Sequence, residues 1–578
     1  MTKNESICAI TEGIGSNGEG IIRHEGVTFF VPACLPGEKV RFKVLKVKGN
    51  IGYGKLEEVL TPAEERARAK CPVFLRCGGC CLQHLDYRAQ LVHKSGVVRD
   101  SLRKIGGIRM EVPTAVACDF PYGYRNKLQM PVGVDKEGKT VVGFYAERSH
   151  RIVPVSACAI HPAWAEDWIA TVKRYLEECA VKGYDEEKKT GAVRHIVARE
   201  IGGNFIFTLV TAKRKLPNLP YFIGLLSEKF SSFSLYINFN DKDTNVIFGE
   251  EFQLVHGTGF FEAEEQGIRY EAGPITFLQV NENMRTKLYK DALETVTGEG
   301  DEVVIDAYSG GGLLTAMIAK RAKRAYGIEL EKEASACADK LKAKNGLENM
   351  TNICGFVEEK LAGVLEKEKG EKLRLILDPP RAGIARSVTK ALLQSGIEKL
   401  TLISCNPATL ARDLGLLTGR LTENEKGELV KNPAYENAGE SETLPGYYAI
   451  EKIQPYDMFP QTKHVETLVV LSHKKPTINL EVALDFENSE IKKSLVDLET
   501  RVKSKETVRV TYKIIQEYIE EKYGFKVHTA YIAEVKRELG LPMYDAPNAV
   551  EELKKPRQHP TEKMVEAIKA ALKYFEII

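Results

Sequence analysis

The sequence has almost no net charge and no long hydrophobic run. Its 578 residues include 82 Lys and Arg against 80 Asp and Glu, a formal net charge of +2. A nucleic-acid surface would therefore have to come from local basic patches rather than from overall charge. No apolar run approaches the roughly 20 residues that a membrane-spanning helix needs. The first residues, MTKNESICAITEG, also lack the apolar core of a secretory signal. We therefore expect a cytoplasmic protein that does not contact a membrane.

Cysteine, in contrast, is plentiful, with 12 residues in the chain. In a reducing cytoplasm, a close group of cysteines indicates a metal site or catalysis rather than disulfide bonds. The chain is long enough for several domains, and its hydrophobic fraction of 43% suffices for buried cores. These features together favour a multidomain enzyme.

Residues 1–62 are predicted to form a small β-rich domain. Short β-rich runs alternate there with Gly, Pro and Asn turns. In VRFKVLKVK one face would pack, while the other carries basic side chains: Arg41, Lys43, Lys46 and Lys48. This pattern is typical of a five-stranded barrel of the oligonucleotide-binding kind, and it resembles the TRAM domain of RNA-modifying enzymes. A solvated edge strand is the simpler alternative.

Three cysteines follow at close spacing. Cys71, Cys77 and Cys80 form the pattern C-x5-C-x2-C, and two glycines let the backbone turn tightly between the last two. A tetrahedral zinc ion or a four-iron cluster would need a fourth ligand. We prefer Cys158 as this fourth ligand and keep Cys118 and Cys81 as alternatives. The spacing alone does not distinguish iron from zinc.

Residues 63–272 are predicted to form a central α+β domain around these cysteines. Residues 87–105 indicate an amphipathic helix with a basic face. Farther along, aromatic and basic side chains interleave and could stack on bases or hold phosphates: Tyr124, Arg125, Lys127, Tyr145 and Arg148. Half-buried strands with solvated basic residues are the alternative.

Strands and helices are expected to alternate in residues 273–475. The run DEVVIDAYSGGGLLTAMIAKR is typical of a strand, a glycine turn and a helix. Three further strands are predicted in RAYGIELEKEA, NMTNICGF and LRLILDPPRAG, and strand-like runs follow in GYYAIEKIQPYDMFP and HVETLVVLSH. Such alternation predicts a doubly wound parallel sheet.

The glycine turn lacks the pattern of a dinucleotide site. The SGGG run at residues 309–312 would let the backbone approach a nucleotide-like ligand, but Thr315 stands where the third glycine of G-x-G-x-x-G would be. Glu329, about 20 residues later at the next strand end, suits ribose hydroxyls. S-adenosylmethionine has the adenosine without the pyrophosphate and therefore fits better. The DPPR run at residues 378–381, at the fourth strand end, strengthens this interpretation.

One cysteine closes the fifth predicted strand. In KLTLISCNPATLARDL, Cys405 follows a short apolar strand and precedes a helix, at the edge where open α/β sheets bind ligands. A nearby helix amino terminus would favour thiolate over thiol. The alternative is a buried strand-end cysteine that packs as a small hydrophobic residue.

Together these motifs resemble the S-adenosylmethionine-dependent RNA 5-methyluridine methyltransferases, and among them the iron–sulfur 23S rRNA (uracil-5-)-methyltransferases. The resemblance covers roughly residues 7–473 and rests on FLQVN, DAYSGGG, GIEL, LDPPRAG, ISCNPATLARDL, DMFPQTKHVETLV and the C-x5-C-G-G-C run. It implies a multidomain α/β protein with an N-terminal OB-like TRAM barrel, a central iron–sulfur domain and a class I Rossmann-like methyltransferase domain. It also implies that the helix at residues 87–105 packs on the catalytic domain.

The resemblance assigns roles to matching positions. It implies that S-adenosylmethionine is held by four residues: Gln279, Tyr308, Glu329 and Asp378. It implies a nucleophile and a general base: Cys405 and Glu466. It implies that a [4Fe-4S] cluster is bound by Cys71, Cys77, Cys80 and Cys158. Tyr308 and Ser309 depart from the Phe and Cys that relatives often have there.

These roles match what the reaction needs. Carbon 5 of uracil is a poor nucleophile until a thiolate adds to carbon 6. After methyl transfer, a base must remove the proton at carbon 5 so that the cysteine can leave. Arg381 or a backbone N–H would steady the enolate oxygen. The target base must be flipped out or lie in a loop, because it cannot be reached within a stack.

The expected substrate is 23S ribosomal RNA, and the enzyme is expected to act as a monomer with no obligate protein partner. The same chemistry on the T-loop of transfer RNA is the nearest alternative. A non-catalytic RNA-binding ribosome assembly factor is another, although intact Cys405, Glu466 and the glycine turn argue against it.

Residues 476–578 are predicted to be a small, mostly helical extension outside the resemblance. INLEVALDF could be an extra strand, and residues 508–523 are predicted to be a helix that Gly524 ends. A second helix would have Thr529 as its N-cap and Gly540 just past its end, and a final helix would follow a loop. The pattern is compatible with a helix-turn-helix-like module or with a small helical packing domain.

Overall fold

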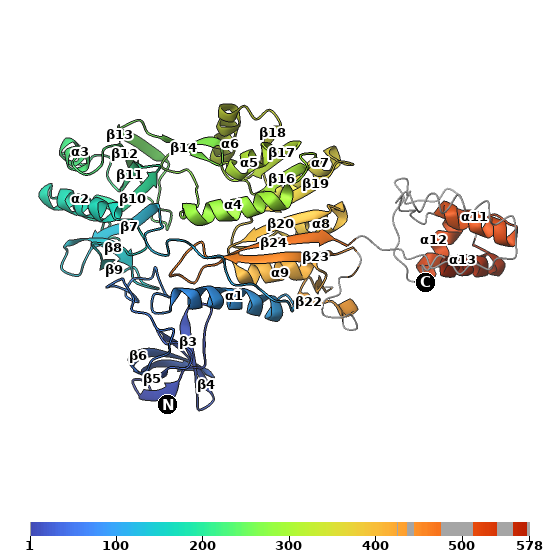
Figure 1. Ribbon diagram of the computed structural model, residues 1–578, viewed down its shortest axis with the longest axis horizontal. Coiled ribbons are helices and arrows are strands. Elements are labelled where there is room, and N and C mark those ends of the chain that lie inside the picture. The colour runs from blue at the N-terminus through green and yellow to red at the C-terminus, as the bar shows by residue number, and fades with distance from the viewer. Residues whose placement is uncertain are drawn as a thin grey trace. The chain divides into compact units, whose positions relative to one another are not determined.

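The computed structural model describes residues 2–424, 426–435, 444, 446–474, 512–539 and 559–574. The chain forms two compact units, Met1–Thr477 and Ile478–Ile578. The described residues of the first unit form three large sheets, and those of the second form three helices (Figure 1). This α/β architecture, with a β-rich N-terminal part, agrees with the prediction from the sequence. The finer division into four domains stays a prediction.

The N-terminal sheet has six strands in the order β1-β5-β6-β4-β3-β2. Its strands are β1 (Ser6–Ile10), β2 (Gly13–Ile14), β3 (Glu19–His24), β4 (Val27–Pro32), β5 (Lys39–Lys48) and β6 (Ile51–Thr61). The predicted number was five, and the extra strand is the two-residue β2, which pairs with β3. β1 at one edge contacts β3 near the other, so the sheet curls on itself around Phe29 and Phe42. Gly52 is required in β6, because a Cβ there would lie 2.4 Å from the Phe29 ring.

Helix α1 (Tyr87–Lys104) links the cysteine-bearing segment to the large C-terminal sheet of the first unit. Its N-cap is Asp86, whose carboxylate accepts a hydrogen bond of 2.9 Å from the N–H of Arg88. Val98 and Leu102 on its inner face join the core that lies under the large sheet. The helix packs beside α9 (Pro407–Leu417) and also touches β23 (Tyr448–Tyr456) (Figure 1).

The central sheet has seven strands in the order β13-β12-β11-β10-β7-β8-β9. Its strands are β7 (Lys127–Val134), β8 (Thr140–Tyr145), β9 (Ile152–Pro154), β10 (Val193–Ile201), β11 (Asn204–Thr211), β12 (Phe233–Phe239) and β13 (Glu251–His256). Two helices pack against it, α2 (Trp164–Glu178) and α3 (Leu219–Ser227). Trp168 stacks on Phe207 with ring centroids 4.2 Å apart, which anchors α2 on the sheet.

A third sheet of seven strands has the order β18-β17-β16-β19-β20-β24-β23. Its strands are β16 (Val303–Ala307), β17 (Arg324–Glu329), β18 (Met350–Cys354), β19 (Leu373–Leu377), β20 (Lys399–Ser404), β23 and β24 (Glu466–His473). The first five strands in this order run parallel, and β24 and β23 are antiparallel to their neighbours. The strand order reverses between β16 and β19, and open sheets of this kind bind ligands outside that point.

Helices bury both faces of this sheet, which is why its strands are apolar throughout. Val304 points to one core and its neighbours Val303 and Ile305 to the other. The helices are α4 (Glu282–Val296), α5 (Leu313–Ala319), α6 (Lys332–Asn345), α7 (Val357–Lys367), α8 (Arg386–Ser395) and α9. Shorter elements complete the unit: β14 (Phe261–Glu265), β15 (Ile268–Ala272), β21 (Leu421–Glu423), β22 (Leu429–Lys431) and the 3-10 turn η1 (Pro433–Tyr435).

The second unit contains α11 (Tyr512–Tyr523), α12 (Thr529–Glu538) and α13 (Glu562–Tyr574), which share one apolar core. Gly524 ends α11 at a φ of +73°, as predicted. The N-cap of α12 is His528 rather than the predicted Thr529, since the His528 Nδ1 accepts from the N–H of Ala530 at 3.2 Å. The predicted strand INLEVALDF and Gly540 lie outside the described residues. Within those residues, no helix has both the length and the apolar character that a membrane crossing requires.

Candidate active site

The six residues predicted to bind S-adenosylmethionine or to catalyse the reaction line one cavity in the first unit. This cavity has a volume of about 1510 Å³ and opens at the carboxyl ends of the parallel strands of the third sheet. The six residues come from segments spread over almost 190 positions of the chain: Gln279, Tyr308, Glu329, Asp378, Cys405 and Glu466. The fold therefore brings together all of these predicted site residues, whose individual roles stay predictions.

The glycine turn shapes one wall of the cavity. Tyr308 has a φ of +68°, a left-handed conformation that non-glycine residues rarely adopt, and its N–H donates to the Ile328 carbonyl. The Glu329 carboxylate accepts hydrogen bonds of 2.8 Å from the N–H groups of Gly310 and Glu331. These bonds fix the carboxylate at the end of β17, where sugar hydroxyls would be recognised in a sheet of this type.

Sequence reasoning missed one acidic residue in this wall. Asp306, the fourth residue of β16, is buried and accepts a hydrogen bond of 2.6 Å from the Thr315 hydroxyl. Burial raises the pKa of Asp306 to about 7, and the nearby Asp378 and Glu329 add to the increase. The sequence signal that could have identified Asp306 was its position at the start of DAYSGGG, near the end of the predicted strand and ahead of the glycines.

Cys405 and Glu466 lie at the same end of two adjacent strands. Strands β20 and β24 are antiparallel and pair Ser404 with Thr467. Cys405 follows Ser404 and Glu466 precedes Thr467, so both side chains reach the cavity beside each other. Asn406 then caps α9, accepting a hydrogen bond of 3.1 Å from the N–H of Ala408. This arrangement puts a nucleophile and a base candidate on one side of one cavity.

Buried carboxyl groups line the cavity, and their burial raises their pKa values. Burial raises the pKa of Glu466 to about 8, and Asp378 raises it further while Arg381 lowers it. Burial also raises the pKa of Asp378 to about 7. A cavity lined by such groups is suited to a cationic ligand, because a positive charge would compensate the carboxylates.

The surroundings of Cys405 act against the expected effect of the helix amino terminus, which would favour the thiolate. Burial raises the pKa of the Cys405 thiol, and the carboxyl groups of Glu466 and Asp378 add to the increase. Arg381 lowers the pKa in part but does not reverse the direction. Burial and the neighbouring acids therefore favour the thiol over the thiolate.

A loop leads from β23 to Glu466, and we call residues 457–465 the base loop. Phe459, Thr462 and His464 of this loop line the cavity. Burial lowers the pKa of His464 to about 4, as do the charges of Arg381 and Lys463. A pKa this low makes the His464 imidazole a weak proton acceptor.

The four cysteines predicted to bind a cluster line a second cavity, of about 400 Å³. They come from two segments of the chain: Cys71, Cys77, Cys80 and Cys158. Burial raises the pKa of Cys80 to about 12 and that of Cys158 to about 11, and the other cysteines of the group add to both increases. Among the residues described, however, no group of three or more His, Cys, Asp or Glu side chains is arranged to hold a metal ion.

The two alternative cysteines lie away from this second cavity. Cys118 is buried, and its sulfur accepts a hydrogen bond of 3.4 Å from the Asn281 amide. Cys81 faces the N-terminal sheet, where a Cβ on Gly18 would lie 3.3 Å from its sulfur. Of the cysteines considered as fourth ligand, only Cys158 lines the cavity with the other three.

One residue predicted to stack on RNA bases is not available for it. Tyr124 is only 8% exposed, and its hydroxyl donates to the Pro460 carbonyl at 3.1 Å. Its expected role as a stacking platform was wrong, because Tyr124 lies before β7 in a segment that packs against Pro460, a contact that the local alternation of aromatic and basic residues does not reveal. Arg125 instead lines both cavities, and Arg148 is exposed.

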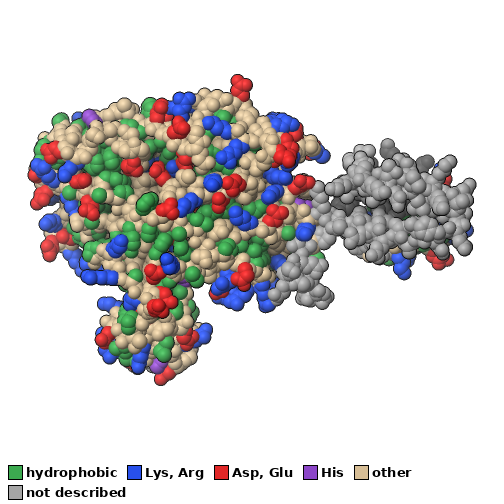
Figure 2. All heavy atoms as spheres, viewed as in Figure 1, with side chains coloured by type: hydrophobic (Ala, Val, Ile, Leu, Met, Phe, Trp, Pro, Cys, Tyr) green, Lys and Arg blue, Asp and Glu red, His purple; other side chains and the backbone are tan. Residues whose placement is uncertain are grey.

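Exposed rings on the cavity wall were also missed. Phe277 is 71% exposed and Phe356 is 51% exposed, and both line the larger cavity. Phe277 begins the FLQVN run and also borders the cysteine cavity. Over the visible face of the first unit, Lys and Arg side chains are mixed with Asp and Glu (Figure 2).

Comparisons with known proteins agree with this site. The sequence model of the family described as tRNA (Uracil-5-)-methyltransferase matches residues 227–425. An uncharacterised RNA methyltransferase of Clostridium tetani is 36% identical over 477 residues, which cover 82% of this chain and 97% of that protein. One from Listeria monocytogenes is 34% identical over 478 residues, covering 82% and 98%.

A solved structure has the same fold over most of the chain. The tRNA (uracil-54, C5)-methyltransferase of Pyrococcus abyssi, in complex with S-adenosyl-L-homocysteine, has a TM-score of 0.61 and is 24% identical. The match covers 80% of this chain and 100% of that structure. With the relatives and the arrangement of the cavity, it leads to one conclusion. The chain belongs to the family of S-adenosylmethionine-dependent RNA uracil-5-methyltransferases.

Proposed function

We propose that this protein methylates carbon 5 of a uridine in 23S ribosomal RNA through a covalent bond between Cys405 and the base. The observation that carries the proposal is the placement of Cys405 and Glu466 at neighbouring strand ends of one cavity. The same cavity is lined by the residues expected to hold S-adenosylmethionine, which supplies the methyl group when bound. A thiol, a base and a cofactor site thus share one space.

The proposed reaction balances in three steps. The Cys405 thiol first gives its proton to solvent; the thiolate then bonds to carbon 6, and the electrons of the carbon 5–carbon 6 double bond move into an enolate. Carbon 5 then takes the methyl group from S-adenosylmethionine, whose sulfur keeps the bonding electrons. Glu466 removes the remaining proton from carbon 5, and the electrons of that bond re-form the double bond and expel the Cys405 thiolate. Glu466 ends protonated and returns the proton to solvent or to the thiolate.

The environment of Glu466 supports its role as the base. Its pKa is raised to about 8 by burial, so the ionised form accepts a proton more strongly than an ordinary glutamate does. Arg381 lies close enough to both groups to lower the pKa of Cys405 and of Glu466. We assign to Arg381 the stabilisation of the enolate oxygen, since a fixed cation in a buried cavity favours developing negative charge.

The rim of the cavity supports an RNA substrate. The exposed ring of Phe277 offers a surface on which unstacked bases pack, and Arg125 beside it offers a cation for phosphate. The target uridine would leave its stack to reach Cys405.

The cysteine cavity supports the proposal of a [4Fe-4S] cluster. Four thiols around one void of about 400 Å³ match the ligand number of such a cluster. The raised pKa values of Cys80 and Cys158 favour thiols unless a cation stabilises the thiolates.

Substitution of Cys158 by serine tests the cluster. Protein purified without oxygen should contain about four iron atoms per chain and absorb visible light. Cys158→Ser should lose most of that iron, whereas Cys118→Ser should keep it. Equal iron in both variants, or stoichiometric zinc in the unaltered protein, would contradict the proposal.

Transfer RNA is the second candidate substrate, and two comparisons favour it. The matching family is described as tRNA (Uracil-5-)-methyltransferase, and the solved structure of the same fold acts on a tRNA uridine. The cysteine cavity and the β-rich N-terminal sheet favour the ribosomal substrate through the resemblance of the sequence to the iron–sulfur enzymes. The two candidates share the chemistry at Cys405.

Methylation of defined transcripts separates these candidates. The protein is incubated with methyl-labelled S-adenosylmethionine and either 23S ribosomal RNA fragments or tRNA, and 5-methyluridine is quantified by mass spectrometry. Product on ribosomal RNA that disappears with Cys405→Ala supports the proposal. Product on tRNA alone would move the assignment to the second candidate. Binding of ribosomal RNA without any product would favour the non-catalytic assembly factor.

A further inference from the structure

Hydrogen bonds from other segments of the first unit hold the base loop in place. Four consecutive carbonyls accept from four different segments of the first unit. The Met458 carbonyl accepts from the Asn281 amide at 3.0 Å, and the Phe459 carbonyl accepts from the Lys94 ammonium at 3.0 Å. The Pro460 carbonyl accepts from the Tyr124 hydroxyl at 3.1 Å.

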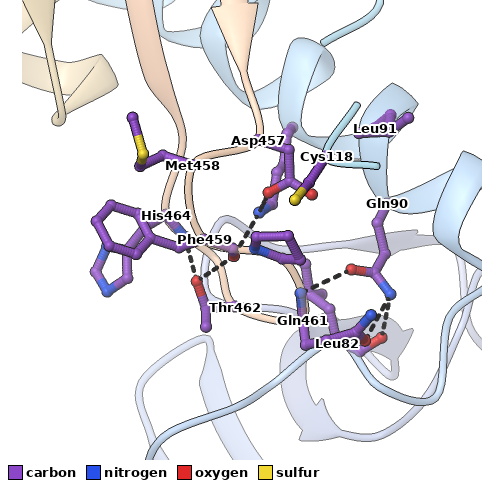
Figure 3. A network of polar contacts seen from close by, with 12 residues as sticks. Leu82, Gln90, Leu91, Cys118, Asp457, Met458, Phe459, Gln461, Thr462 and His464 are labelled. Carbon is purple, nitrogen blue, oxygen red and sulfur yellow. Dashed lines mark hydrogen bonds and ion pairs between the residues drawn. The ribbon is translucent and has the colours of Figure 1, made fainter. Parts of the chain in front are cut away.

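The fourth carbonyl is tied to the cysteine-bearing segment. The Gln461 carbonyl accepts hydrogen bonds of 3.1 Å from the N–H groups of Cys81 and Leu82, directly after Cys80. The Gln461 side-chain oxygen accepts from the Gln90 amide at 3.0 Å. The backbone N–H of Gln461 donates to the side-chain oxygen of Gln90 at 3.2 Å (Figure 3). Gln461 itself has a φ of +69°, a conformation that persists only where surrounding contacts impose it.

A buried ion pair anchors the start of the base loop. The ammonium of Lys94, on α1, pairs with the carboxylate of Asp457, and the two side chains are 1% and 0% exposed. Burying two charges costs desolvation, and an apolar pair of similar volume would join a helix to a sheet at least as well. Such a pair does, however, fix one geometry, because few other arrangements satisfy both charges.

We propose that Lys94, with Gln90 on the same helix, is a positioning residue that sets where Glu466 stands in the cavity. The base loop that these two residues hold ends at Val465, the residue before Glu466. Neither Lys94 nor Gln90 lines the cavity, so each acts only through the loop. The same loop ties the catalytic base to the segment that carries Cys80. This inference rests on the proposed function, because it assigns Glu466 to proton removal.

The inference predicts a defect in one step of the reaction. Attack by Cys405 does not need Glu466, whereas release of the methylated base does. Displacing Glu466 should therefore let the covalent RNA–protein complex form and then persist. A general loss of stability would instead lower formation and release together.

Lys94→Met removes both ties that the ammonium makes. With natural uridine RNA and S-adenosylmethionine, denaturing gels should show the covalent complex about 10-fold above the level of the unaltered protein. The turnover number should fall about 10- to 100-fold, the size of effect expected for a catalytic group displaced by about 1 Å. KM for RNA should change less than about 3-fold. Glu466→Gln serves as the reference for full loss of release.

Two further variants guard against misreading. Lys94→Met leaves Asp457 as an unpaired buried charge, so Lys94→Met with Asp457→Leu removes both charges and restores packing while the Phe459 carbonyl stays untied. Arg324→Met is the control for loss of an ion pair elsewhere in the sheet. Arg324 pairs with Glu368 and Glu371 at the opposite, amino-terminal end of the same sheet.

The outcomes separate the inference from the proposed function. Accumulation of the complex in Lys94→Met and in the double variant, but not in Arg324→Met, supports the inference. Accumulation in Glu466→Gln alone, with normal release in both Lys94 variants, overturns it and leaves the proposed function intact. Equal accumulation in Arg324→Met also overturns it. No complex in any variant overturns the inference together with the proposed function.

Discussion

Burial changes the ordinary acid–base properties of a few side chains at the larger cavity. Three carboxyl groups beside one cavity, Asp306, Asp378 and Glu466, have pKa values raised to about 7 or 8. S-adenosylmethionine carries a positive sulfonium, so these groups would be easier to ionise once it is bound. Without a ligand, ionising these carboxyl groups is unfavourable. A bound cation would compensate their negative charge.

The raised pKa of Glu466 predicts a pH dependence of stability. The folded protein keeps this proton up to about pH 8, whereas an unfolded glutamate loses it near pH 4.3. The group's contribution is complete below about pH 4.3 and is lost as pH rises to about 8. Glu466→Gln removes this loss. The free energy of unfolding of the variant, minus that of the unaltered protein, should therefore be larger at pH 8.5 than at pH 5 by roughly 2 to 4 kcal/mol.

Denaturant unfolding at the two pH values measures this difference. Asp301→Asn is a suitable control, since that carboxylate lies in an exposed ion pair with Lys372 rather than in the cavity. Parallel pH profiles for Glu466→Gln and the unaltered protein would show that Glu466 is not held in its proton-bound form.

Among the elements, α1 connects most directly to the catalytic machinery. It packs on α9, the helix that starts just after Cys405, and it holds the base loop through Gln90 and Lys94. The contact with α9 is close, because a Cβ on Gly106 would lie 2.5 Å from the Ala411 carbonyl oxygen. Only a glycine permits this approach.

Gly106→Ala is therefore expected to force α1 away from α9. The free energy of unfolding should fall by about 1 to 3 kcal/mol, the usual cost of overpacking. Gly106 lies just past the end of α1, whereas Gly96 lies within the helix. Gly96→Ala should be neutral or stabilising, because only the flexible end of Arg99 lies near its added Cβ, at 3.8 Å. Denaturant unfolding of both variants provides the measurement. Equal stability of the two variants would contradict the close packing of α1 on α9.

Much of each element could be predicted from the sequence, but the links between elements could not. The apolar runs and the turn residues predicted the presence of the parallel strands, and the predicted helix at residues 87–105 matches α1 to within one residue, since both depend on local periodicity. The base loop gives no such signal. Gln461 of this loop and its partner Gln90 are 371 positions apart. The strained φ of Gln461 follows from contacts made only in the folded chain. The burial of Tyr124 was missed for the same reason.

At the scale of the whole molecule, the two compact units have separate cores. Among the described residues, α11, α12 and α13 share an apolar cluster of their own, and the first unit has its own clusters. A chain that ends at Lys474 should therefore keep the main unfolding transition of the unaltered protein. It should also methylate a short RNA fragment within about 2-fold of the original rate.

Calorimetry and methylation of the shortened protein test this independence. Aggregation or loss of the main transition would show that the second unit supports the first. Unchanged folding with weaker binding of long RNA would instead favour the helix-turn-helix-like interpretation of the three helices, in which the second unit contacts nucleic acid.

The central claim is that Cys405 bonds covalently to the target uridine and that Glu466 then allows release. The most direct test uses ribosomal RNA that contains 5-fluorouridine, because fluorine cannot leave as a proton does. With S-adenosylmethionine present, peptide mass spectrometry should find methylated fluorouridine attached to Cys405, and Cys405→Ala should give no adduct. An adduct on another cysteine, or methylated RNA without any adduct, would contradict the account.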